Sequence, residues 1–161
     1  MNFINQKSII MKNIYLVLLL ISTFGFTQDF SQPKGGGTLD IVLVSPDDGY
    51  SIMNFEGNIS GYGLVFAKIK VSSINTSKTS GTLDGDARTM LNDGTLISTP
   101  IKGSWKRKGA LVKFYFTDAI NNGAMNFVMW DVNLLEKKAA VKYFELHGAD
   151  TVSYTHLTLP T

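Results

Sequence analysis

The stretch LVKFYFTDAINNGAMNFVMWDVN, residues 111–133, predicts a β-hairpin and is the strongest indication of the fold class. Apolar and polar residues alternate on both sides of INNGA, which is the period of a strand with one buried face. A loop of Asn121–Gly123, with the glycine in the left-handed conformation, pairs Ile120 with Ala124. The pairs that follow are Val112 with Val132, Phe114 with Trp130 and Phe116 with Val128 on one face, and Lys113 with Asp131 on the other. A two-residue loop would set apolar residues against charged ones, so we predict the three-residue loop.

Three further hairpins extend the inner face along the chain. In LNDGT, a three-residue loop of Asn92–Gly94 joins two strands. It places six of their residues on the inner face: Leu83, Gly85, Ala87, Thr89, Ile97 and Ile101. In SWKRKGALV, a Lys108–Gly109 turn sets Trp105 opposite Val112, Gly103 opposite Phe114 and Ile101 opposite Phe116. In LLEKKAAV, pairing Leu134 with Ala139 sets Val132 opposite Val141 and Trp130 opposite Tyr143, and places Asp131 between Lys113 and Lys142. One strand with small inward residues is therefore expected beside strands with aromatic ones.

The rest of the chain repeats the pattern of short strands and tight turns. The turn signals SPDDG, LNDG, KRKG, INNG and LEKK recur at the spacing of successive hairpins, and no stretch after residue 37 has a helical period. A chain of 161 residues with 44% hydrophobic and 17% charged residues suits one globular domain. We therefore predict an all-β domain over residues 38–151, an antiparallel up-and-down meander that closes into a small barrel or a strongly curved sheet.

The N-terminus has the layout of a secretory signal. A lysine, an apolar run and small residues follow one another in MKNIYLVLLLISTFGFTQD, and the apolar run is short for a membrane span. We assign residues 1–27 to an upstream extension plus a signal helix, with a single anchoring helix as the alternative, and residues 28–37 to a linker. The chain has no cysteine, which excludes a cleaved lipoprotein. We expect a bacterial protein that is periplasmic or secreted, with no membrane contact after signal cleavage.

The last ten residues, VSYTHLTLPT, are unlike the rest of the chain. This segment, residues 152–161, resembles a translated transposase adapter from a sequencing library, for which a metagenomic assembly is a natural source. The resemblance implies that the β domain is truncated at its C-terminal end. It also removes His156 and Tyr154 as site candidates and leaves His147 as the one histidine to consider.

Charge argues against a nucleic-acid partner. The formal net charge is +2, but Lys7 and Lys12 lie in the N-terminal segment, and without them basic and acidic residues balance. The cluster KRK, residues 106–108, is predicted to keep a hairpin turn soluble.

No motif indicates a metal or a cofactor. The segment GNISGYG, residues 57–63, precedes an alternating strand, which favours a bulged strand over a phosphate loop. The acids Asp84, Asp86 and Asp93 lack the spacing of a calcium loop and are expected on a solvated face. His147 has no second nitrogen or sulfur ligand within the β domain. We therefore expect no cofactor and no metal.

The inner aromatic residues are the candidate ligand-binding site. Dense packing is the first interpretation of small residues facing large ones, and a pocket floored by Gly85 and Ala87 is the second. An enclosed cavity of roughly 300 Å³ or more would favour a pocket. The leading hypothesis is an exported, non-enzymatic barrel that binds a small apolar or aromatic ligand, with four residues as walls: Trp105, Phe114, Trp130 and Tyr143.

The outer face offers an alternative function. Apolar residues gather there beside a ladder of charged ones, and such a patch is usually covered. Its members are Tyr115, Phe127, Met129, Phe144 and Leu146. The alternative is a structural or interaction module of the cell envelope that docks a partner protein or a second copy of the chain. An enzyme that uses outward carboxylates such as Asp84 and Asp86 is a third hypothesis.

The meander of short strands behind a signal resembles a calycin-type barrel, the architecture of lipocalins and avidins, over residues 38–147. The Gly-x-Trp signature of lipocalins belongs near the first strand, whereas Gly103-Ser104-Trp105 lies in the middle of this chain. The resemblance therefore implies a secreted barrel and transfers neither a ligand nor a binding residue.

Overall fold

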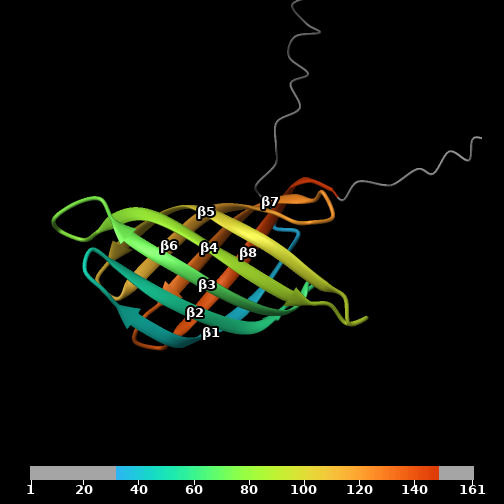
Figure 1. The fold of residues 1–161 in the computed structure, drawn as a ribbon, viewed down its shortest axis with the longest axis horizontal. Helices are drawn as coiled ribbons and strands as arrows, with labels where there is room; N and C mark the ends of the chain where they lie inside the picture. The colour runs from blue at the N-terminus through green and yellow to red at the C-terminus, as the bar shows by residue number, and fades with distance from the viewer. Residues whose placement is uncertain (1–31, 149–161) are drawn as a thin grey trace, which may run out of the picture.

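The computed structural model describes residues 32–148 (Figure 1). The predicted signal helix, the adapter-like segment, Tyr154 and His156 lie outside the described residues. Within residues 32–148 there is no helix long and apolar enough to cross a membrane.

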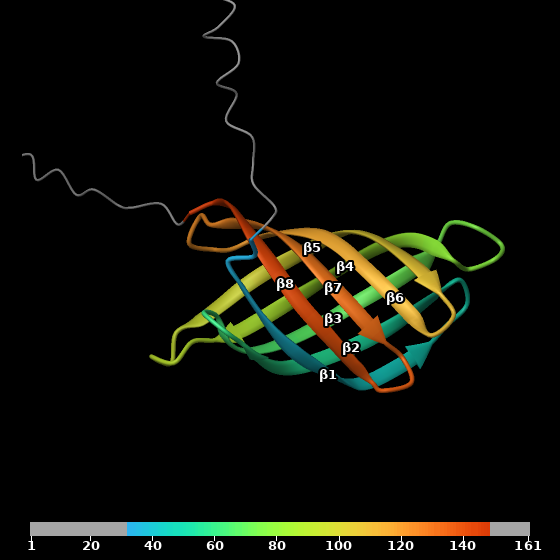
Figure 2. The ribbon, with the colours of Figure 1, turned by 180° about the vertical axis from the view of Figure 1, so that it is seen from behind.

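The described chain is a closed barrel of eight antiparallel strands in sequence order, which confirms the all-β meander and selects the barrel over the curved sheet (Figures 1 and 2). The strands are β1 Gly35–Pro46, β2 Tyr50–Ile59, β3 Gly63–Ser73, β4 Ser80–Met90, β5 Leu96–Lys108, β6 Leu111–Ala119, β7 Met125–Asn133 and β8 Lys138–His147. Each strand pairs with its neighbour in sequence, and β1 pairs with β8 to close the barrel. The fold is compatible with a calycin-like barrel.

The closing seam between β1 and β8 depends on glycine. The strand β1 begins at Gly35, inside the segment predicted as a linker, and Gly37 stands opposite Val141 of β8. A Cβ atom on Gly36 would lie 2.2 Å from the carbonyl oxygen of Val141, and one on Gly37 would lie 2.5 Å from that of Asn58. The Gly35–Gly37 run is therefore a close backbone contact and forms part of the barrel.

Two predicted registers are confirmed. Between β6 and β7, Phe114 stands opposite Trp130, and the Ile120 amide donates a 2.8 Å hydrogen bond to the carbonyl oxygen of Ala124. Gly123 has the left-handed φ of 88° that the three-residue loop requires. Between β4 and β5, Thr89 stands opposite Ile97 as predicted.

Two other registers are wrong by two residues. Between β5 and β6, Trp105 stands opposite Phe114, not Val112, because the turn is Gly109–Ala110. Gly109, with a φ of 62°, is the first central residue of that turn, as in a type II′ hairpin.

The β7–β8 loop lies one residue before the position that the predicted pairing of Leu134 with Ala139 implies. Asn133 pairs with Lys138 across the four-residue loop Leu134–Lys137, so Trp130 stands opposite Val141, not Tyr143. Asp131 forms an ion pair with Lys113 and stands opposite Ala140, not Lys142. A shift of two residues leaves every side chain on its predicted face, so the inner set is unchanged.

Candidate functional site

The middle of the barrel is packed with aromatic rings. The centroid of the Trp130 ring lies 4.9 Å from that of Phe55 and 6.1 Å from that of Phe114. Phe116 packs edge-on against Trp130 at 5.3 Å. These distances are typical of favourable aromatic pairs, and the rings divide the interior into two ends.

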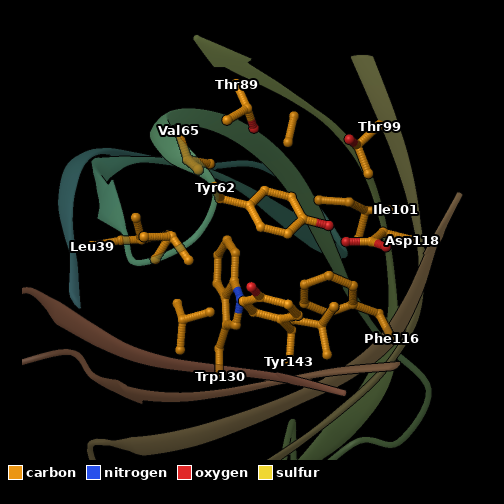
Figure 3. A pocket seen from close by; sticks show the side chains of 14 residues that line it. Leu39, Tyr62, Val65, Thr89, Thr99, Ile101, Phe116, Asp118, Trp130 and Tyr143 are labelled. Carbon is orange, nitrogen blue, oxygen red and sulfur yellow. The ribbon is translucent and has the colours of Figure 1, made fainter. Parts of the chain in front are cut away.

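A cavity of about 50 Å³ lies at the end where the β2–β3, β4–β5 and β6–β7 turns gather (Figure 3). Its wall is mostly apolar, with a few polar groups that converge on it. The lining residues are Leu39, Ile59, Tyr62, Val65, Ala87, Thr89, Thr99, Ile101, Phe116, Asp118, Val128, Trp130, Val141 and Tyr143. One water molecule needs about 10–15 Å³, so the cavity has room for a few waters or for a group of similar size.

A hydrogen-bonded cluster closes this end of the barrel. Asp118, which is only 7% exposed, accepts hydrogen bonds at Oδ1 from the Asn126 amide nitrogen at 3.2 Å and from Asn126 Nδ2 at 2.9 Å. Asn126 Nδ2 also donates to the Tyr62 hydroxyl. The Tyr62 ring lies 4.9 Å from that of Tyr143, and the hydroxyl points toward the Asp118 carboxyl group (Figure 3). The cluster therefore links the β2–β3 turn to strands β6, β7 and β8.

Two buried polar atoms on the cavity wall have no hydrogen-bond partner among the described residues. They are Nε1 of Trp130 and Oγ1 of Thr99. Both residues are buried and line the cavity. A buried donor that lacks a partner costs roughly 1–3 kcal/mol, so these atoms offer binding energy to a group that could bond to them.

Burial shifts the pKa values of the titratable side chains that line the cavity. Burial raises the pKa of the Asp118 carboxyl group, against the hydrogen bonds from Asn126, which lower it. Burial also raises the pKa of Tyr62 and that of Tyr143, with a further contribution from nearby carboxylates. No lysine, arginine or histidine lines the cavity, so no basic group compensates for the acid. The site favours uncharged groups.

Tyr62 and Tyr143 line both this cavity and a second hollow of about 300 Å³, so these two side chains lie between the two spaces. Tyr62 lies between two glycines with left-handed backbone conformations, Gly61 with a φ of 81° and Gly63 with a φ of 121°. A Cβ atom on Gly61 would lie 2.9 Å from the Tyr143 hydroxyl oxygen. Glycine is therefore required for the turn to hold Tyr62 over the barrel end.

The four predicted wall residues are all buried, but they do not share one site. Trp130 and Tyr143 line the cavity. Trp105 and Phe114 line a hollow of about 310 Å³ at the opposite end, where Trp105 Nε1 donates a 3.1 Å hydrogen bond to the carbonyl oxygen of Ser72. Of the predicted floor, Ala87 lines the cavity, whereas a Cβ on Gly85 would lie 2.2 Å from the carbonyl oxygen of Lys68. Packing fills the centre, and space remains at the ends.

The other sequence candidates lie away from this cavity. Asp84 faces outward and forms a 3.0 Å ion pair with Lys102, and Asp86 stands opposite Pro100, as the register predicts. Within residues 32–148 no three His, Cys, Asp or Glu side chains gather as a metal site. Four hollows of the described barrel are each lined by a single carboxylate, so none of these four contains a carboxylate pair for acid–base chemistry.

The predicted outer patch is less exposed than expected. Phe144 is only 6% exposed, and its ring lies 6.4 Å from that of Phe127. Tyr115, Phe127 and Met129 are half-buried. Phe144 stands opposite Phe127 in the regular part of the ladder, and a register shift follows between Met125 and Asn126, which the alternation of residues alone could not reveal.

Sequence reasoning missed Asp118, Asn126 and Tyr62. The first two had a signal, because the period of two from Phe116 and Val128 places Asp118 and Asn126 on the inner face. A polar residue on an inward position is informative, since it needs a buried partner. Tyr62 lies in a turn and had no periodic signal.

Comparisons with protein-family models, with curated proteins and with solved structures find no match. The fold and the site therefore define the protein as a small, closed, antiparallel β-barrel with an apolar cavity at one end.

Proposed function

We propose that the protein is a non-enzymatic binding protein whose ligand is a small molecule with an apolar or aromatic body and one hydrogen-bond acceptor. The ligand body lies against Trp130, Phe116 and Tyr143, which line the cavity. The acceptor atom of the ligand accepts a hydrogen bond from the indole N–H group of Trp130. Export to the periplasm or outside the cell, inferred from the apolar segment within residues 11–27, belongs to the same proposal.

The proposal is carried by the unpartnered Nε1 of Trp130; Oγ1 of Thr99, on another part of the wall of the same cavity, is also unpartnered. Buried donors in stable proteins are normally satisfied, and Trp105 in the same barrel follows that rule through Ser72. An apolar pocket with a few convergent polar groups and a perturbed acid is the usual form of a small-molecule site.

Tyr62 sets the size of the ligand. The inner cavity of about 50 Å³ is much smaller than a typical ligand pocket, which has roughly 300–1,000 Å³. A rotation of the Tyr62 side chain out of the barrel end joins this cavity to the outer hollow of about 300 Å³. The combined volume of the two spaces falls within the usual range for a ligand pocket. The Tyr62 side chain therefore controls access to the site. The alternative, docking of a partner on the outer face of β6–β8, has less support because Phe144 is buried.

The test uses prodan, a fluorescent naphthalene ketone that has an aromatic body and a carbonyl acceptor. The protein should bind prodan with a blue shift of its emission. Ala87→Leu, which places a larger side chain in the cavity, should abolish the shift. Trp130→Phe keeps an aromatic ring but removes the N–H group, and it should weaken binding roughly 3- to 10-fold, because a hydrogen bond contributes about 0.5–1.5 kcal/mol.

The control is Trp105→Phe, an aromatic replacement at the opposite end of the barrel. This variant should bind prodan as the unaltered protein does. Circular dichroism spectra and thermal unfolding show whether each variant is folded. Equal binding by a folded Ala87→Leu variant would place prodan elsewhere and refute the proposed site.

A further inference from the structure

The end of the barrel opposite Tyr62 has an unusual surface. The connections β3–β4, β5–β6 and β7–β8 lie together there (Figures 1 and 2). The three most exposed large hydrophobic side chains of the described residues lie at these connections. They are Leu135, 84% exposed, Ile74, 70% exposed, and Leu111, 60% exposed. We call these three residues the apolar tips.

Basic residues surround the apolar tips. They are Lys78, Lys106, Arg107, Lys108 and Lys137, and all five are exposed. No ion pair joins any of them to another described residue. The acids at this end are Asp47, Asp48 and Glu136. Asp47 accepts a hydrogen bond from the Tyr50 hydroxyl and lines the same hollow as Lys78 and Arg107, so the acids only partly offset the five basic residues. The surface around the tips therefore carries an excess of positive charge.

Hydrogen bonds hold two of the tips in place. In the β3–β4 connection, Asn75 Oδ1 accepts a 3.0 Å hydrogen bond from the Thr79 amide. The carbonyl oxygen of Thr79 accepts another from the Arg107 amide at 2.7 Å, which ties this connection to β5. In the β7–β8 loop, Asn133 Oδ1 accepts a 3.1 Å hydrogen bond from the Leu135 amide. Ile74 and Leu135 are thus presented to solvent by ordered turns.

We propose that this end of the barrel docks on a membrane surface rich in anionic lipid. Apolar side chains ringed by lysine and arginine match the boundary between acyl chains and negatively charged headgroups. The tips are separate points on three connections, which suits insertion into fluid lipid. A protein interface typically has a continuous apolar core instead.

This docking differs from the expectation of no membrane contact after signal cleavage, and the balanced net charge of the chain gives no sign of it. Net charge does not report where charges lie. The closed barrel brings the KRK cluster at residues 106–108 beside Lys78 and Lys137, although these residues are far apart in the sequence. The docking surface is at the opposite end from the proposed ligand cavity and does not depend on it.

The test places a fluorescent probe on one tip. The chain has no cysteine, so Leu135→Cys creates a single site for an environment-sensitive thiol probe. Leu96→Cys is the matched control, because Leu96 is 52% exposed at the opposite end of the barrel. Each labelled protein is mixed with vesicles of phosphatidylcholine alone, or with one third phosphatidylglycerol. A local probe separates contact at this end from any attachment through the apolar N-terminal segment.

The probe at position 135 should shift to the blue with phosphatidylglycerol vesicles only, and the shift should disappear at high salt. The probe at position 96 should not respond. In the labelled Leu135→Cys background, Lys106→Gln with Lys108→Gln should lower the partition coefficient roughly 30-fold, since each base near an anionic surface contributes about 1 kcal/mol. Lys68→Gln, an exposed lysine on the barrel wall, should have little effect.

Three outcomes would overturn the proposal. The first is no shift at position 135 with anionic vesicles, which would leave an acidic protein as the candidate partner. The second is an equal shift with phosphatidylcholine alone, which would remove the role of charge. The third is an equal response at position 96, which would show that contact does not occur through this end.

Discussion

Replacement of Asp118 by asparagine tests the electrostatics of the cavity. The Asp118 carboxyl group is buried and accepts two hydrogen bonds from Asn126 through one oxygen, Oδ1. Asparagine has nearly the same shape and keeps an acceptor oxygen at that position, but it cannot ionise. The variant therefore removes the buried charge and preserves the hydrogen bonds.

The sign of the effect follows from the pKa. Burial raises the pKa of Asp118 in the folded state above its value of about 3.9 in the unfolded chain. Between these two pKa values the folded protein holds a proton that the unfolded chain has released. The free energy of unfolding therefore falls as pH rises through this window, and the loss persists above it. Asp118→Asn does not ionise and so does not lose this stability. Above the window, its free energy of unfolding should gain on that of the unaltered protein by about 1.4 kcal/mol for each unit by which the pKa is raised.

The assay is urea unfolding at a series of pH values from about 3 to 8, followed by tryptophan emission. The measured quantity is the free energy of unfolding of Asp118→Asn minus that of the unaltered protein. All other carboxyl groups are common to both proteins, so their contributions cancel in this difference. Tyr62 and Tyr143 stay neutral over this range because their pKa values are raised. The difference should increase as pH rises.

Asp118→Ala is the matched control. It removes the acceptor and leaves the buried Asn126 amide without its partner, which costs roughly 1–3 kcal/mol. This variant should be less stable than Asp118→Asn at every pH. A difference between Asp118→Asn and the unaltered protein that stays flat, or that falls with pH, would refute the account of a buried acid whose pKa is raised.

Three further predictions concern the barrel itself. Phe114→Ala removes a fully buried ring from the aromatic centre and should lower the free energy of unfolding by about 3–5 kcal/mol in urea titrations; a loss below about 1 kcal/mol would mean that the centre is loosely packed. Gly36→Ala places a Cβ within 2.2 Å of the carbonyl oxygen of Val141 and should lower the free energy of unfolding by at least about 1–3 kcal/mol. Gly148→Ala is the control and should be nearly neutral, because the nearest described atom to its Cβ is 3.9 Å away. Equal effects of the two substitutions in thermal unfolding would contradict the tight β1–β8 seam. The ion pair of Lys113 with Asp131 is exposed, so a double-mutant cycle should give a coupling free energy of about 0.2–1 kcal/mol that declines as salt is added. A coupling free energy that salt does not change would show that the pair is shielded from solvent.

Much of the barrel could be predicted because strand periodicity is local. The alternation of residues in 111–133 identifies the inner face of β6 and β7, and a turn with its glycine in the left-handed position specifies their register. At the β5–β6 and β7–β8 turns the loop lies one residue from its predicted position, which shifts the pairing of the strands by two residues. The predicted inward and outward faces of these strands remain correct, because a shift of two residues in the pairing keeps each side chain on the same face.

Residue alternation and turn signals were enough to predict the fold class, the two faces of most strands, and the inward position of four residues: Trp105, Phe114, Trp130 and Tyr143. The end of the barrel at which each inward residue lies is known only from the three-dimensional structure, because it depends on the stagger of all eight strands and on the β1–β8 closure. That stagger separates Trp105 from Tyr143, brings Tyr62 over Asn126, and gathers five basic residues around three apolar tips. These contacts join residues far apart in the chain, and local alternation carries no information about such distances.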